Sequence, residues 1–173
     1  MSEQTYMNLK DAVKRPTLTN ENINRENKHF KRVVDKYQKW CTDEGGYKDS
    51  RVTYENDIID CLEEYDLDGF ALAQHLSEYK YIEPDSELVH ILEDVTFVKS
   101  SLETEMLNQW VKENFLTIPD DVVGKKVNVK QGIRKYENHY ITGIKPETYQ
   151  VTVSDKIDKN GGYIVGFENV TFL

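Results

Sequence analysis

The chain has 173 residues, of which 38% are hydrophobic and 31% are charged, and its formal net charge at pH 7 is −9. Eleven tyrosines and six phenylalanines supply large apolar surfaces, which excludes wholesale disorder. The two cysteines are too few for a disulfide framework, and no apolar stretch approaches the roughly 20 residues that a membrane helix needs. We therefore expect a cytoplasmic protein that does not act in a membrane.

The charge is sorted into three blocks along the chain. Residues 1–40 carry nine Lys and Arg against five Asp and Glu, residues 41–121 carry five against twenty-one, and residues 122–173 carry eight against five. The net charges of the blocks are therefore +4, −16 and +3. Surfaces of opposite sign bind different partners, so the pattern predicts an interaction protein with more than one surface.

The chain begins with a polar stretch that Pro16 interrupts, so we expect a flexible arm over residues 1–20, with a short helix around Leu9 to Lys14. Apolar residues then recur at helical spacing: Ile23, Phe30, Val33, Val34, Tyr37 and Trp40. This spacing predicts a helix from about Glu21 to Thr42. Basic residues occupy its other face: Arg25, Lys28, Lys31, Arg32, Lys36 and Lys39.

Three further helices are predicted from start signals that precede apolar residues at helical spacing. Thr53 can cap the first of them, and Asp68 can cap the second. The segment Glu83-Pro84-Asp85 precedes a long third helix from Ser86 to about Asn114. We expect residues 21–118 to form one helical domain of three to four helices, acidic on its outside.

At Pro119 the period of the apolar residues changes from about 3.6 to 2, which is typical of strands. Five short strands are predicted, around Val127 to Val129, Tyr140 to Thr142, Tyr149 to Val153, Tyr163 to Phe167 and Val170 to Phe172. The segment Asn160-Gly161-Gly162 is predicted to be a hairpin turn. Five strands in so few residues favour a small barrel over 119–173, and the fold class is α+β.

The strand rhythm from Val123-Gly124-Lys125-Lys126-Val127-Asn128-Val129 to Gly162-Tyr163-Ile164-Val165-Gly166-Phe167-Glu168-Asn169-Val170 resembles that of the SH3-like barrels, including the KOW and Tudor-type members. The resemblance covers less than a third of the chain and implies a domain that binds peptides, RNA, DNA or other proteins, or one that is only structural. The pairing of an acidic helical body with such a barrel also resembles small accessory proteins of bacteriophages.

The segment Glu64-x-Asp66-x-Asp68-Gly69 partly matches a calcium-binding EF-hand loop. The match fails at the twelfth position, where His75 cannot supply the two oxygens that a bidentate glutamate provides. We therefore interpret Asp68 as a helix cap and expect no metal and no cofactor. The chain has no phosphate-binding glycine loop and no nucleophile motif, so we do not expect an enzyme.

The leading functional hypothesis is a non-enzymatic adaptor or inhibitor that presents an acidic helical face to a basic protein partner. Many like charges on a small body repel each other, and a basic partner relieves that repulsion. The candidate residues of this face are Asp57, Asp60, Glu63, Glu64, Glu87, Glu93 and Asp94. Solubility alone is the simpler explanation of the same carboxylates.

The alternative hypothesis is a nucleic-acid-associated protein that uses the barrel, because aromatic rings stack on bases while cations bind phosphates. Its candidate residues are Lys125, Lys126, Lys130, Arg134, Lys135, Tyr136 and Tyr140. Self-association is a third possibility, in which the basic helix of one copy contacts the acidic face of another.

Overall fold

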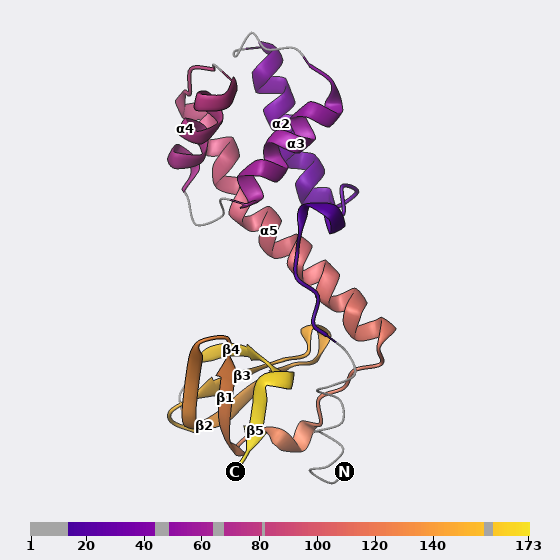
Figure 1. Cartoon of the computed structure of the whole chain (residues 1–173), viewed down its shortest axis with the longest axis vertical. Coiled ribbons are helices and arrows are strands. Elements are labelled where there is room, and N and C mark those ends of the chain that lie inside the picture. Colours follow the sequence, from indigo (N-terminus) through magenta and orange to yellow (C-terminus); the bar gives the residue numbers. More distant parts are fainter. Residues whose placement is uncertain (1–13, 44–48, 64–67, 81, 158–160) are drawn as a thin grey trace. The chain divides into compact units, whose positions relative to one another are not determined.

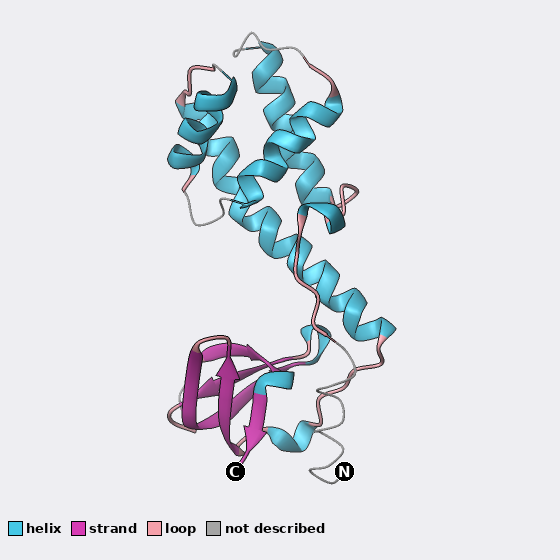
Figure 2. Ribbon diagram, viewed as in Figure 1, coloured by secondary structure: helices cyan, strands magenta, loops and turns pink. Residues whose placement is uncertain are grey.

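The computed structural model describes residues 14–43, 49–63, 68–80, 82–157 and 161–173, and its fold class is α+β, as predicted. Four helices precede a five-stranded sheet within these residues (Figures 1 and 2). The helices are α2 (Lys28–Asp43), α3 (Arg51–Glu63), α4 (Gly69–Lys80) and α5 (Ser86–Glu113). The strands are β1 (Lys126–Gln131), β2 (Arg134–Lys145), β3 (Gln150–Ser154), β4 (Tyr163–Gly166) and β5 (Val170–Phe172).

The chain divides into two compact units, and the division falls within α5. The helical unit is Thr17–Thr104, and the sheet unit is Glu105–Leu173 together with the N-terminal segment up to Pro16. The sequence placed the start of the barrel at Pro119. In the structure the last turns of α5 already belong to the sheet unit, because Trp110 and Val111 are buried in its core.

Helix α2 begins at Lys28, seven residues after the predicted start at Glu21. The side chain of Asn27 accounts for this start, since its Oδ1 accepts hydrogen bonds from the backbone amides of His29 (2.9 Å) and Phe30 (3.3 Å). The predicted apolar face is otherwise confirmed. Its buried members are Phe30, Val33, Val34, Tyr37 and Trp40.

The caps of the next helices confirm two of the three predicted start signals. The Oδ1 atom of Asp68 accepts the amide of Ala71 at 2.8 Å, and that of Asp85 accepts the amide of Leu88 at 2.8 Å. Helix α3, however, begins at Arg51, and the residue before it supplies the side-chain cap instead of Thr53. The predicted short helix around Leu9 and the residues Glu64 and Asp66 of the EF-hand-like segment lie outside the described residues.

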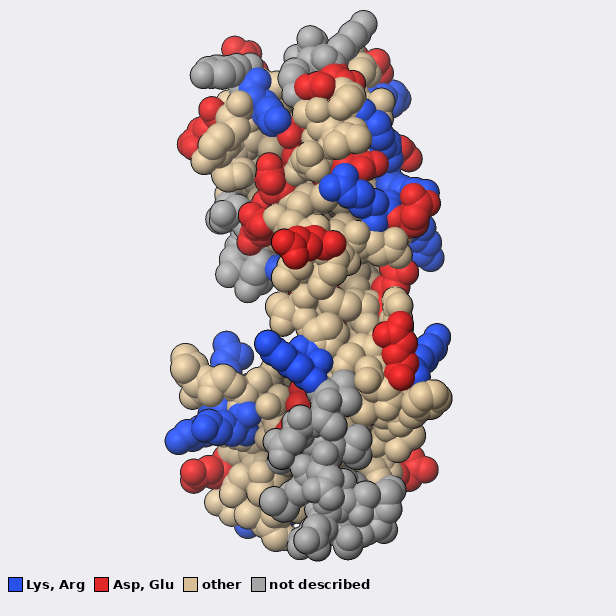
Figure 3. Space-filling model, turned by 45° about the vertical axis from the view of Figure 1, so that its right-hand side comes forward, with Lys and Arg blue, Asp and Glu red and all other residues tan. Residues whose placement is uncertain are grey.

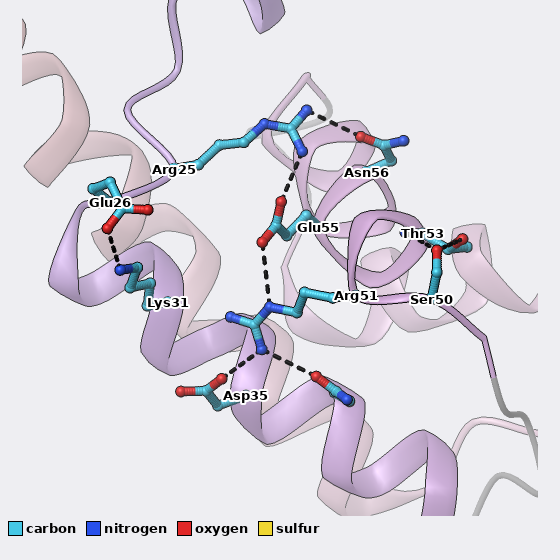
Figure 4. Close-up of polar contacts among 10 residues, drawn as sticks. Arg25, Glu26, Lys31, Asp35, Ser50, Arg51, Thr53, Glu55 and Asn56 are labelled. Carbon is cyan, nitrogen blue, oxygen red and sulfur yellow. Dashed lines mark hydrogen bonds and ion pairs between the residues drawn. The ribbon is translucent and has the colours of Figure 1, made fainter.

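A chain of ion pairs joins the segment before α2 to α2 and α3 (Figure 4). The carboxylate of Glu55 accepts hydrogen bonds from Arg25 Nη1 at 2.8 Å and from Arg51 Nε at 3.2 Å. Arg51 also donates to Asp35 at 2.5 Å and to Gln38 at 3.0 Å. The hydrogen bond from Arg25, followed by that from Arg51, lowers the pKa of Glu55. Glu55 is therefore the acceptor through which two arginines hold these segments together.

Helices α4 and α5 approach each other closely at Gly69. A Cβ atom added to Gly69 would lie 2.5 Å from the carbonyl oxygen of Val89 and 3.0 Å from the backbone nitrogen of Glu93. Both neighbours are backbone atoms of α5, which cannot rotate away. Glycine is therefore required here because a larger residue does not fit between the two helices. The requirement is not conformational, since the φ angle of Gly69 is not in the left-handed region.

In the sheet unit, the five antiparallel strands have the order β4-β3-β2-β1-β5. The first four strands follow one another as a meander, and the short turn Phe167–Asn169 then carries the chain to β5, which pairs with β1. The predicted strands are all present. Gly161 has the positive φ expected of the predicted hairpin turn, at 107°, whereas Asn160 of that turn lies outside the described residues.

The guanidinium of Arg15 fastens the N-terminal segment to the sheet unit. It donates to both carboxylate oxygens of Glu168, at 2.6 and 3.1 Å, and to the carbonyl oxygen of Tyr149 at 2.8 Å. It also lies over the ring of Trp110, 5.2 Å from the ring centroid. A bidentate pair combined with a cation–π contact fixes the guanidinium on both its edge and its face.

Among the described residues, no helix combines the length and the apolar character that crossing a membrane requires.

We predict that Gly69→Ala destabilises the helical unit by about 1 to 3 kcal/mol, because the added methyl group overlaps the backbone of α5. Chemical denaturation followed by circular dichroism at 222 nm measures the effect. The control is Gln74→Ala, an exposed position of the same helix. Equal stability of the two variants would contradict the prediction, because it would show that α4 and α5 can move apart at Gly69 without a loss of stability.

We also predict that Glu55→Gln lowers stability at pH 7 and that its deficit disappears as the pH falls below about 4.3, the ordinary pKa of glutamate. The pKa of Glu55 is lowered in the folded protein, so its carboxylate stabilises the fold above the unfolded pKa and loses that effect as the pH falls through the folded pKa. Denaturation at several pH values measures the difference, with the exposed residue Glu83 changed to Gln as control. A deficit that stays constant down to pH 3 would contradict the role of the charge.

Candidate nucleic-acid interface

A groove of about 580 Å³ opens in the sheet unit between the β1–β2 hairpin and the start of β4. Its lining residues are Gln131, Gly132, Ile133, Arg134, Tyr136, Gly162, Tyr163 and Ile164. Two of them are glycines at which the backbone itself forms the wall. A Cβ atom added to Gly162 would lie 2.3 Å from the carbonyl oxygen of Val153, whereas one added to Gly132 would have no neighbour within 4 Å. Only at Gly132 is the space of the missing side chain open to a ligand.

A β-bulge in β2 places two aromatic side chains of this strand, Tyr136 and His139, on one face. The register of β1 with β2 shifts between the pairs Val127↔His139 and Val129↔Tyr136. Asn138 lies in the bulge with a φ of 57°, and its backbone amide donates to Asn128 Oδ1 at 2.9 Å. Both valines are buried, so His139 and Tyr136 share the face that is directed at the core.

Tyr163 of β4 completes an aromatic cluster with these two rings. It stacks on Tyr136 with a centroid distance of 4.5 Å and an interplanar angle of 22°, and its centroid is 6.3 Å from that of His139. Its partner across the sheet, Val153, is buried, whereas Tyr163 itself is 53% exposed. The cluster therefore extends the core outward and ends in an aromatic ring that a ligand can reach.

Three cations surround the tip of the β1–β2 hairpin. Lys130 is paired directly with Lys135, and Gln131 with Arg134. All three cationic residues are exposed, and within the part of the chain that the structure describes none of them forms an ion pair. Like charges directly opposite each other in a sheet are destabilising. An anionic ligand would relieve that repulsion.

The structure places the predicted nucleic-acid residues in two groups. Arg134 and Tyr136 line the groove, and Lys130 and Lys135 belong to the same hairpin but lie on its other face. The remaining three, Lys125, Lys126 and Tyr140, lie at the opposite end of the hairpin, where β1 begins. Lys125 forms an ion pair with Asp121 at 2.8 Å, and Lys126 is paired with Tyr140.

Tyr140 lies on the opposite face of β2 from His139 and Ile141, because successive residues of a strand alternate. It is therefore not part of the aromatic cluster, although the sequence grouped it with Tyr136. The sequence did not propose His139, Tyr163 or Ile133 as site residues. The strand pattern identified Tyr163 as a strand residue, but only the curvature of the sheet brings it to Tyr136.

The described acidic candidates have different surroundings in the structure. Asp57 is buried, with 2% of its side chain exposed, and its carboxylate accepts the hydroxyl of Tyr37 at 3.1 Å and pairs with Lys80 at 2.7 Å. We therefore withdraw Asp57 from the surface to which the sequence assigned it. Asp94 pairs with Lys36 at 2.8 Å, and Glu64 lies outside the described residues.

The other acidic residues are exposed, on α3 and α5. The side-chain carboxylates of Asp60 and Glu87 are exposed and have no hydrogen-bond partner among the described residues, whereas the carboxylate of Glu63 accepts a hydrogen bond from Asn20 and that of Glu93 one from His90. On the face of the helical unit that Figure 3 shows, Lys and Arg are interspersed with Asp and Glu. A second hollow, of about 690 Å³, is lined partly by two acidic residues and one basic residue, Glu21, Glu63 and Lys99.

The described residues contain no group of three His, Cys, Asp or Glu side chains arranged to hold a metal ion. Both cysteines are buried, and burial is the main cause that raises the pKa of Cys41 to about 11 and that of Cys61 to about 12. Thiols with such pKa values are protonated at neutral pH and are weak nucleophiles. The chemistry that the described groups support best is binding by stacking and by charge.

Comparison of the chain with family models, with curated proteins and with solved structures finds no match.

Proposed function

We propose that this protein is a non-enzymatic nucleic-acid-binding protein that holds a single strand in the groove between the β1–β2 hairpin and β4. The observation that carries the proposal is the stacked pair Tyr136 and Tyr163 in a groove that is also lined by Arg134, a cation without an ion pair among the described residues. Rings that are partly buried are held in place, so a base stacks on them without an entropic cost of ordering them. Arg134, which lines the same groove, supplies the charge for a phosphate.

The same unit is proposed to be an SH3-like barrel. Its support is the connectivity: a four-stranded meander, then the turn Phe167–Asn169, then a fifth strand that pairs with the first. Pairing of the last strand with the first leaves β4 and β5 as the edges of a strongly bent sheet. The groove lies at one of these edges, where β4 begins.

A single strand suits the groove better than a duplex does. The tyrosines stack face to face at the mouth, and only unpaired bases expose a face on which Tyr163 can stack. A volume of about 580 Å³ holds one or two nucleotides, which is a small part of a duplex. The net charge of −9 opposes binding of any polyanion. Contacts of the hairpin cations with phosphates release counterions, so we expect the affinity to fall as the salt concentration rises.

A second candidate function is the docking of a basic protein partner on carboxylates of the helical unit, and one observation favours it. Desolvation, together with the neighbouring carboxylates of Asp57 and Glu63, raises the pKa of Asp60. Carboxylates that repel each other in this way are stabilised when a cation approaches. The exposed residue Glu87 on α5 adds to the acidic surface.

We predict that Tyr163→Ala weakens binding of a short labelled oligothymidylate or oligouridylate roughly 5- to 150-fold, because stacking of one base is worth about 1 to 3 kcal/mol. Fluorescence anisotropy at low salt measures the dissociation constant. Tyr163→Phe retains the ring and is expected to bind like the wild type. The matched control is Tyr79→Ala, which removes an exposed tyrosine of α4. Absence of binding by the wild type, or an equal loss in the control, would refute the proposal.

For the second candidate, we predict that reversing Asp60, Glu63 and Glu87 to Lys abolishes capture of a basic protein partner, because attraction becomes repulsion. Pull-down at two salt concentrations, followed by mass spectrometry, measures the loss. The control is Glu147→Lys, an exposed carboxylate of the sheet unit. A partner that the triple variant retains at both salt concentrations would exclude this surface.

A further inference from the structure

The tip of the β1–β2 hairpin presents an apolar side chain to solvent among cations. Ile133 is 99% exposed, a higher fraction than that of any other large hydrophobic residue among those described. Gly132 precedes it with a φ of 59°, and the pair forms the two-residue loop between Gln131 and Arg134. A glycine in the first position is typical of a tight II′ turn, whose second position is open to most residues. The turn therefore does not require isoleucine.

The side chain of Ile133 also contributes almost no buried area to the fold. A Cβ atom added to Gly132 would have no neighbour within 4 Å, so the tip projects away from the rest of the unit. Exposing an isoleucine forgoes the stabilisation that its burial would give, and single exposed apolar residues are ordinary on protein surfaces. What distinguishes Ile133 is its surroundings: it lines the groove, and Lys130, Arg134 and Lys135 lie within three residues of it.

We propose that Ile133 is a wedge that inserts between two adjacent bases of the bound nucleic acid while the hairpin cations contact the flanking phosphates. The inference rests on the proposed function and adds the way in which the strand is held. Apolar side chains of this kind enter base steps when neighbouring cations bind the backbone on either side. The wedge separates two bases, and one of them can then stack on Tyr163, which lines the same groove.

The alternation of the hairpin supports two sets of phosphate contacts. Arg134 is paired with Gln131 and lies on the same face of the hairpin as Tyr136, whereas Lys130 and Lys135 lie on the other face. Cations are therefore present on both faces of the ribbon whose tip carries Ile133. A strand that crosses the tip meets positive charge before and after the wedge, which fits a polyanion with apolar bases between its charges.

A lipid surface is the other partner that combines anionic groups with an apolar phase. One isoleucine gives a small insertion energy, and stable membrane attachment generally needs more apolar area or a second anchor. The stacked tyrosines behind the tip can stack on the bases of a nucleic acid. The chemistry of the whole groove therefore favours nucleic acid over a membrane.

The test uses a single-stranded oligonucleotide that contains 2-aminopurine, whose fluorescence rises when its neighbours unstack. The full-length wild type is expected to raise this fluorescence on binding, and Ile133→Ser is expected to abolish the rise and to weaken binding about tenfold. Its melting temperature should be unchanged, because the side chain is 99% exposed. The matched control Val123→Ser removes another exposed apolar residue of the sheet unit and is expected to behave like the wild type.

The outcomes separate the wedge from the function on which it rests. If Ile133→Ser binds and brightens the probe like the wild type while Tyr163→Ala binds more weakly than the wild type, the wedge is wrong and the groove remains. If the wild type binds no oligonucleotide, both are wrong. If the wild type instead binds vesicles of phosphatidylserine and phosphatidylcholine through Ile133, and not the oligonucleotide, the tip is a membrane anchor and the proposal is overturned.

Discussion

The helical unit depends on one buried carboxylate. Asp57 of α3 is bonded to the hydroxyl of Tyr37 on α2 and to the ammonium of Lys80 on α4, so a single side chain joins three helices. Burial, with the neighbouring Cys41 and Asp57, raises the pKa of Tyr37, which keeps its hydroxyl a hydrogen-bond donor. Removing one partner of such a group leaves the other groups buried and unpaired. This loses more stability than replacing the whole cluster by apolar residues of similar volume. The packing of the surrounding apolar residues must therefore accommodate this polar cluster.

In the sheet unit the corresponding constraint is the bulge at Asn138. In a regular strand Tyr136 and His139, which are three positions apart, would point to opposite faces of β2. The left-handed backbone of Asn138, held by the side chain of Asn128, brings both rings to one face, where Tyr163 meets them. The shared face of Tyr136 and His139 is thus a consequence of this bulge, and a second register shift follows in the pairing of β2 with β3, between Ile141 and Gly143.

The buried Asp57 and the bulge at Asn138 are features that the sequence could not predict, whereas the helices and strands could be predicted. The helices and strands followed from the periods of their apolar residues, and the caps at Asp68 and Asp85 followed from local chemistry. The burial of Asp57 could not be predicted, because its partners are 20 and 23 positions away in the chain and its own neighbours in sequence are carboxylates and apolar residues alike. The bulge could not be predicted either, since nothing in the strand pattern distinguishes a residue that is skipped from one that is paired.

The net charge of a block does not show which of its charges the fold has already paired. The central block carries a charge of −16, yet its Asp57, Glu55 and Asp94 are each paired with cations of other elements in the helical unit. The last block carries only +3, yet the three cations at the hairpin tip have no ion pair among the described residues. A ligand interacts with charge that the fold has not already neutralised. The relevant quantity is therefore unpaired charge held near a fixed apolar surface, and in the described residues the hairpin and groove combine the two.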